Sequence, residues 1–126
     1  ACRDGGSIAF VLSSSVRSPI PGLAISNGLR PGLAGLAKTL ADELGPAGVR
    51  VNGLLPGSFD TERARELAAQ SPDPEALRRR REAEIPLRRY GSPLEFGRVA
   101  AFILSPVASY ITGTTIAIDG GALRTF

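Results

Sequence analysis

The sequence predicts an α/β fold in which a parallel sheet is covered by helices. Short apolar runs, typical of buried parallel strands, alternate along the chain with longer segments of helical periodicity. This alternation indicates strands joined by helical crossovers, because parallel neighbours cannot be linked by a tight turn. We expect strands at 7–12, 49–55 and 115–118, and helices at about 27–44, 61–70, 74–85 and from 92 to before Pro106.

The first strand ends in a run of serines, and a loop with two prolines separates it from the first helix. The helix is predicted because apolar side chains recur at helical spacing and should pack on the sheet. These side chains are Leu33, Leu36, Leu40 and Leu44. With Asn27 as the N-cap, Pro31 should cause a bend or a late start, and Gly45-Pro46 should end the helix.

The second strand ends abruptly at Pro56-Gly57, and Asp60 or Thr61 is expected to cap the helix that follows. The last helix is expected to start at Ser92-Pro93-Leu94-Glu95, with Ser92 as the cap and Glu95 at N3. A strand that stops at a Pro-Gly corner places the corner at its carboxyl end. Ligands bind at the carboxyl ends of strands in open α/β sheets, so this corner is the first candidate site.

A run of four arginines, 78–81, raises the alternative of a nucleic-acid surface in a chain of net charge +3. On a helix, however, consecutive residues point in different directions. Glutamates stand at i,i+4 spacing from three of these arginines, and no aromatic residue is interleaved for base stacking. The pattern favours a solvated helix over a nucleic-acid partner.

The amino-acid composition excludes several kinds of catalytic and metal site. Within its 126 residues the sequence contains no histidine and one cysteine, Cys2. This excludes Ser-His-Asp and Cys-His catalytic sites within the chain. It also removes the usual zinc ligands, so no metal is expected. No apolar run reaches the ~18 residues of a membrane span. The single cysteine fits a reducing compartment, and we expect a cytoplasmic protein. The absence of methionine suggests a piece of something longer.

Three segments, taken in order, resemble the carboxyl-terminal half of the short-chain dehydrogenases/reductases. They are GSIAFVLSS, GLAGLAKTLADELGPAGVRVNGLLPG and IPLRRYGSPLEFGRVAAFILSPVASYITGTTIAIDGG. The resemblance implies the carboxyl-terminal part of a Rossmann-type oxidoreductase domain over 1–126, most similar to the 3-oxoacyl-carrier-protein reductase branch. The family's glycine-rich nucleotide-binding turn has no counterpart. The amino-terminal half of the domain is therefore expected to be absent, and the chain alone to be inactive.

The resemblance also implies a cofactor, NAD or NADP. The family's Pro-Gly-x-x-x-Thr segment, which folds against the nicotinamide, is matched by 56–61. The residues expected to contact the cofactor are Pro56, Gly57, Phe59 and Thr61. Family members usually pair through the helix matched by 32–44 and through the region matched by 93–118, so a homodimer or homotetramer is expected for the full-length protein.

The catalytic residues depart from the family's pattern. Ser13 falls at the position of the catalytic serine, and aligning Gly35-Leu36 places Ser26 and Arg30 where the family has its tyrosine and lysine. An aliphatic hydroxyl is a far weaker acid than a phenol, so Ser26 cannot easily replace the proton relay. Arg30 keeps the positive charge. Ser13 either orients a substrate carbonyl or satisfies local backbone.

Two hypotheses follow. In the first, the protein is an NAD(P)-dependent oxidoreductase that reduces a carbonyl or oxidises an alcohol, with Ser13, Ser26 and Arg30 in its catalytic site. In the second, it is an inactive family member that binds a nucleotide or a partner protein. The missing tyrosine favours the second, and the retained Ser13 and Pro-Gly-x-x-x-Thr segment favour the first. If the resemblance holds, Ser13, Ser26 and Arg30 should converge near Pro56-Gly57.

Overall fold

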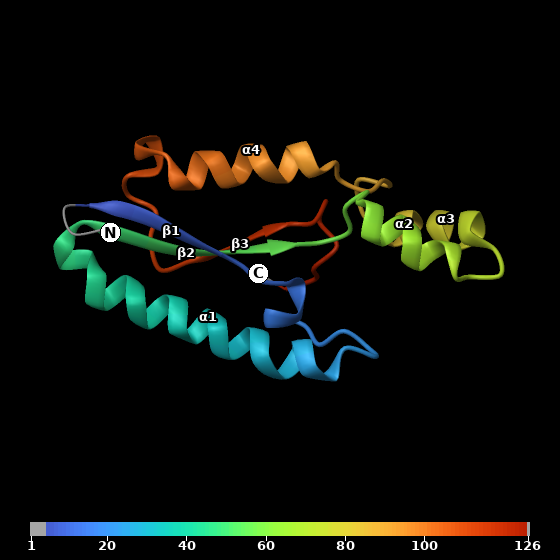
Figure 1. Ribbon diagram of the computed structural model, residues 1–126, viewed down its shortest axis with the longest axis horizontal. Coiled ribbons are helices and arrows are strands. Elements are labelled where there is room, and N and C mark those ends of the chain that lie inside the picture. The colour runs from blue at the N-terminus through green and yellow to red at the C-terminus, as the bar shows by residue number, and fades with distance from the viewer. Residues whose placement is uncertain (1–4, 126) are drawn as a thin grey trace.

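The computed structural model describes residues 5–125 and places three parallel strands in one sheet. These are β1 (Gly6–Val11), β2 (Val49–Pro56) and β3 (Thr115–Ile118), hydrogen-bonded in the order β1-β2-β3. The three predicted strands are confirmed, and β2 forms the centre of the sheet (Figure 1).

Helices cover both faces of this sheet (Figure 1). α1 (Ala24–Leu44) packs on one face, and α4 (Pro93–Leu104) packs on the other. α2 (Glu62–Ala69) and α3 (Pro74–Glu84) lie side by side beyond the carboxyl end of β2. The predicted Rossmann-like layering is therefore confirmed. No helix within 5–125 is both long enough and apolar enough to cross a membrane.

The core centres on β2, as its apolar composition predicts. Its four largest apolar side chains are at most 1% exposed: Val49, Val51, Leu54 and Leu55. Asn52, also fully buried, donates from Nδ2 to the carbonyl of Ile111 (2.8 Å) and accepts the N–H of Thr114 (3.3 Å). The amide pairs both of its polar ends, as a buried polar group requires, and fixes the approach to β3.

The start of α1 differs from the prediction. The helix begins at Ala24, before Asn27, and Pro31 lies inside it, so the expected late start is wrong. Asn27 does not cap the helix. Its amide instead accepts the N–H of Ile20 (3.0 Å) and donates to the carbonyl of Ile20 (2.9 Å). The side chain thereby holds the loop that precedes α1 against the helix.

The predicted packing of the leucine stripe is wrong at two positions. Leu33 and Leu36 are 40% and 46% exposed, whereas Ala37 and Ala41 are buried against the sheet. Only the later leucines of the stripe, Leu40 and Leu44, are partly buried against this core. The alanines follow the same helical spacing as the leucines but one residue later, which rotates their face by about 100°. Small side chains allow the helix to approach the sheet closely.

Helix ends follow the predicted chemistry. Thr61 Oγ1 accepts the N–H of Ala64 (3.1 Å), and Ser92 and Glu95 form a reciprocal capping box at the start of α4. α1 ends at Leu44 as expected, but the left-handed residue is Gly48 (φ 72°), not Gly45, because a short 3-10 turn intervenes.

The arginine run lies on α3, and its predicted ion pairs are confirmed. Arg78 pairs with Glu82 at 2.9 Å; the other two i,i+4 pairs are Arg79–Glu75 (3.5 Å) and Arg80–Glu84 (3.8 Å). Within 5–125 no group of three or more His, Cys, Asp or Glu side chains could hold a metal ion.

Candidate active site

A cavity of about 350 Å³ opens at the carboxyl ends of β1 and β2. Ser13 lines it from the end of β1, and Pro56 and Gly57 line it from the end of β2. Backbone hydrogen bonds set this arrangement: Leu12 donates to the carbonyl of Leu54 (2.8 Å), and Gly57 donates to that of Ile118 (3.0 Å). Parallel pairing thus brings Ser13 and the Pro56-Gly57 corner to one edge of the sheet.

Ser13 caps a short 3-10 turn, Ser14–Val16. Its Oγ accepts the N–H of Ser15 at 3.1 Å, so the local backbone role considered for this serine is present. A hydroxyl that accepts in this way retains its own hydrogen for donation. Within residues 5–125 that hydrogen has no acceptor, which leaves it available to a carbonyl oxygen in the cavity.

Ser26 lies in the first turns of α1 and faces the same short turn. Its Oγ is 3.2 Å from the Oγ of Ser15, a residue only 3% exposed. Ser26 does not line the cavity. It reaches Ser13 indirectly, through Ser15, whose N–H is held by Ser13 and whose hydroxyl meets Ser26.

Arg30 lies one helical turn beyond Ser26 and binds the end of β1. Its Nη1 donates to the carbonyl oxygens of Val11 (3.1 Å) and Leu12. The guanidinium thereby holds the two residues immediately before Ser13. The predicted convergence is met by Ser13 and the Pro56-Gly57 corner. Ser26 and Arg30 instead surround the backbone that presents Ser13.

The four predicted cofactor contacts divide into two pairs. Pro56 and Gly57 line the cavity. Phe59 packs edge-on against Phe96 (ring centroids 5.7 Å apart) and covers Gly91, while the hydroxyl of Thr61 caps α2. Phe59 and Thr61 therefore shape the segment that follows the corner, and neither lines the cavity beside Ser13.

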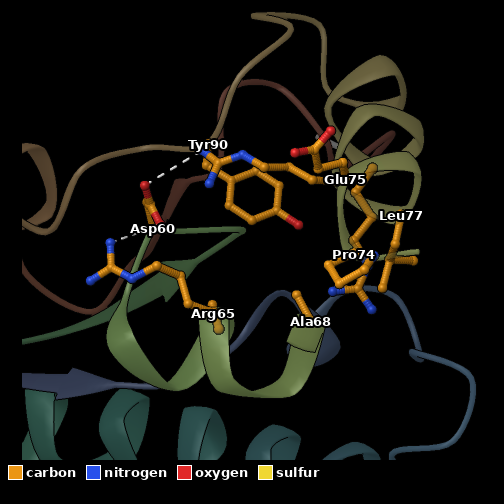
Figure 2. Close-up of a pocket in the computed structure, with 10 residues that line it drawn as sticks. Asp60, Arg65, Ala68, Pro74, Glu75, Leu77 and Tyr90 are labelled. Atoms are coloured by element: carbon orange, nitrogen blue, oxygen red, sulfur yellow. Dashed lines mark hydrogen bonds and ion pairs between the residues drawn. The ribbon is translucent and has the colours of Figure 1, made fainter. Parts of the chain in front are cut away.

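A second cavity, of about 250 Å³, lies between α2 and α3 (Figure 2). Asp60 pairs there with Arg65 (3.3 Å) and Arg78 (3.5 Å), and the Arg78 guanidinium lies 5.0 Å from the centre of the Tyr90 ring. The pKa of Arg78 is raised above its ordinary value, mainly because its side chain donates to Glu82 and to a lesser extent because it donates to Asp60. This cluster joins α2, α3 and the segment before α4.

Sequence reasoning missed Ser15 and this second cluster. Ser15 gave one signal, its place in a serine run directly after a buried strand. Its partner Ser26 comes from a helix, and only tertiary structure brings the two together. The Asp60–Arg78 pair spans a helix–helix connection and gave no periodic signal.

Comparison with known proteins places this geometry in a family. A family model described as enoyl-(acyl carrier protein) reductase matches residues 1–122. Over 120 residues the chain is 40% identical to the peroxisomal 2,4-dienoyl-CoA reductase of Saccharomyces cerevisiae, covering 94% of this chain and 39% of that protein. The chain belongs to the short-chain dehydrogenase/reductase family.

Solved structures of short-chain dehydrogenases/reductases superpose closely on this chain. The L-sorbose reductase of Gluconobacter frateurii, solved with NADPH and L-sorbose, is 31% identical with a TM-score of 0.89, over 98% of this chain and 49% of that one. A short-chain oxidoreductase of Pseudomonas aeruginosa, described as containing an atypical catalytic center, is 32% identical with a TM-score of 0.86, over 95% and 48%. The chain thus spans about half the length of these relatives or less.

Proposed function

We propose that this chain is the carboxyl-terminal, substrate-side part of an NAD(P)-dependent oxidoreductase that reduces a carbonyl or oxidises an alcohol. The observation that carries the proposal is the position of Ser13. Its hydroxyl lines a cavity at the carboxyl ends of β1 and β2 and keeps a hydrogen free to donate within the described residues. The other half of the domain would supply the glycine-rich nucleotide-binding turn.

The residues at the cavity fit a nicotinamide. Pro56 and Gly57 form one wall without any long side chain, and about 350 Å³ is open beside them. NAD or NADP, when bound, would supply or accept the hydride. A complex with NADPH is described for the L-sorbose reductase of Gluconobacter frateurii, which supports this assignment.

In this proposal Ser13 donates a hydrogen bond to the substrate oxygen and stabilises the negative charge that grows there during reduction. Ser15 positions Ser13 through its backbone N–H, and Ser26 anchors Ser15. Arg30 holds the carbonyls of Val11 and Leu12 and so fixes the strand end. Ser26 and Arg30 then act as positioning residues. The proton is exchanged through solvent at the cavity, since neither side chain is a ready acid.

A second candidate, an inactive member that binds a nucleotide or a partner, is favoured by a different observation. The only two tyrosines, Tyr90 and Tyr110, lie away from the Ser13 cavity. Tyr90 lines the α2–α3 cavity, and Tyr110 is fully exposed. Within the described residues no phenol is therefore available at the site to relay a proton.

The test uses the full-length protein. NADH and NADPH are titrated by their fluorescence, and turnover is measured with small ketones and alcohols. We expect one of the two to bind, and Ser13→Ala to lower kcat about a hundredfold without weakening cofactor binding. Ser109→Ala, at an exposed serine before β3, is the matched control and should change neither.

Cofactor binding without any turnover would instead support the inactive candidate. Absence of binding to both cofactors would overturn the proposal.

We further propose that the full-length protein is a homodimer or homotetramer, because α1 exposes a row of large apolar side chains.

A cytoplasmic location also stays a proposal, based on the single cysteine. One relative, that of Saccharomyces cerevisiae, is named as peroxisomal, so fractionation of cells is the measurement that decides it.

A further inference from the structure

The cavity between α2 and α3 shares no lining residue with the cavity beside Ser13. Figure 2 shows the Tyr90 ring with Asp60 on one side and Pro74 and Leu77 on the other. The space therefore lies within the α2–α3 unit, and its chemistry is separate from that of the Ser13 cavity.

One part of the lining is apolar. Ala64 and Ala68 contribute it from α2, and Pro74 and Leu77 contribute it from α3. Small side chains on one helix leave the space that the two helices would otherwise fill. An apolar group placed here would be removed from water, which favours binding.

The charged part of the lining is mostly compensated. Asp60 accepts from both Arg65 (3.3 Å) and Arg78 (3.5 Å), and Arg78 is also bound to Glu82 at 2.9 Å. Glu75 is paired with Arg79 (3.5 Å), which stands outside the cavity. These groups offer little net charge to a ligand.

Arg81 is the exception. It lines the cavity from α3, and it is the one charged lining residue without an ion pair inside 5–125. Its guanidinium is a fork of donors suited to a carboxylate. The cavity thus combines an apolar wall with a single uncommitted cation, the complement of a molecule that has an apolar chain and one anionic end.

The volume sets the scale of this molecule. About 250 Å³ lies below the ~300–1,000 Å³ of pockets that take drug-sized ligands, which favours a small molecule. We propose that this cavity binds a small aliphatic carboxylate of about six carbons, with its carboxylate at Arg81 and its chain against Ala64, Ala68 and Leu77. The proposal needs no hydride chemistry, so it stands or fails independently of the function proposed above.

The test uses the full-length protein, because this chain spans about half the length of its relatives or less. Isothermal titration calorimetry measures the binding of each ligand. Titration with hexanoate should saturate with a millimolar Kd. Hexanol, which matches the chain but lacks the charge, should bind about tenfold more weakly.

Two neighbouring arginines provide the matched variants. Arg81→Gln should weaken hexanoate binding about tenfold and leave hexanol binding unchanged. Arg80→Gln, at a residue that points away toward Glu84, should leave both within twofold. Far-ultraviolet circular dichroism verifies that both variants remain folded. The proposal is overturned if hexanoate shows no saturable binding, if hexanol binds as tightly, or if both variants weaken hexanoate equally.

Discussion

The hydroxyl oxygens of Ser15 and Ser26 lie 3.2 Å apart, joining the turn after β1 to the start of α1. Ser15 is nearly fully buried, whereas Ser26 is partly exposed. Because the N–H of Ser15 is held by Ser13, this contact couples α1 to the serine that lines the cavity. Ser26, placed by alignment at the position of an acid, therefore serves in this structure as an anchor for its neighbour.

Replacement of Ser15 by alanine should destabilise the protein by about 1 kcal/mol, the net worth of one hydrogen bond. The cost stays modest because Ser26 is partly exposed and water can satisfy its hydroxyl. Urea unfolding measures the change, with Ser18→Ala at an exposed serine as the control. A Ser15→Ala protein as stable as the control would mean that the Ser15–Ser26 contact contributes nothing to stability.

The double change Ser26→Tyr and Arg30→Lys should raise turnover of the full-length protein if the pocket remains competent. A phenol beside a cation is a far better proton donor than an aliphatic hydroxyl. The wild type should turn over ordinary ketones only weakly, because an aliphatic hydroxyl at position 26 is a poor proton donor. Steady-state kinetics compare the two proteins, and adding Ser13→Ala to the double variant should abolish the gain. Strong wild-type activity that survives Ser13→Ala would contradict the role given to these positions.

The sequence predicted the features that depend on local chemistry. The strand β2 carries four buried apolar side chains: Val49, Val51, Leu54 and Leu55. Pro56 ends this strand for lack of an N–H. The caps at Thr61 and Ser92 satisfy helix N–H groups within the same segment. Such signals need no knowledge of distant residues, and for that reason these elements appear where they were expected.

The sequence did not predict which face of α1 packs, since the leucines and the alanines follow the same spacing. Size alone favoured Leu33 and Leu36, but close approach of helix to sheet favoured Ala37 and Ala41. The contacts of Arg30 were equally invisible, because the carbonyls of Val11 and Leu12 belong to another element. Tertiary contacts therefore decided the parts of the site that local pattern could not.

Acid should weaken the start of α4 through Glu95. Two hydrogen bonds from Arg89 (2.6 and 2.9 Å) and then the backbone N–H of Ser92 lower the pKa of Glu95 from 4.5 to about 2. A folded-state pKa below the unfolded value means that this stabilisation is complete above about pH 4.5 and is lost as the pH falls toward 2. Glu95→Gln should therefore reduce the fall in Tm between pH 7 and pH 3.

The matched control for Glu95 is Glu84→Gln, which removes a more exposed carboxylate that lies 3.8 Å from Arg80. Thermal melts followed by circular dichroism should give this variant the same fall in Tm as the wild type. An identical fall in the Glu95→Gln protein would show that the Arg89–Glu95 pair does not contribute to acid sensitivity.

The exposed face of α1 should be an interface between copies of the full-length protein. Four large apolar side chains form one row on it, from 40% to 79% exposed: Ile25, Leu29, Leu33 and Leu36. Glutamates at Leu33 and Leu36 would place charges in such an interface and should yield monomers. Leu67→Glu, at a similarly exposed leucine on α2, should leave assembly unchanged. Sedimentation velocity at micromolar concentration measures the oligomeric state of the wild type and the variants. A monomeric wild type would refute the interface.

Two glycine-to-alanine changes should shift stability in opposite directions. A Cβ on Gly57 would lie 2.6 Å from the Cβ and 2.7 Å from the Cα of Asp119, and a backbone atom cannot move aside cheaply. Gly57→Ala should therefore cost about 1–3 kcal/mol and distort the corner beside Ser13. Gly97 lies in the interior of α4, where a methyl group would meet no neighbouring atom within 4 Å, so Gly97→Ala should stabilise by up to about 1 kcal/mol through helix propensity. Urea unfolding of both variants compares the signs directly. Equal effects would show that the close approach of β2 to Asp119 does not constrain the corner.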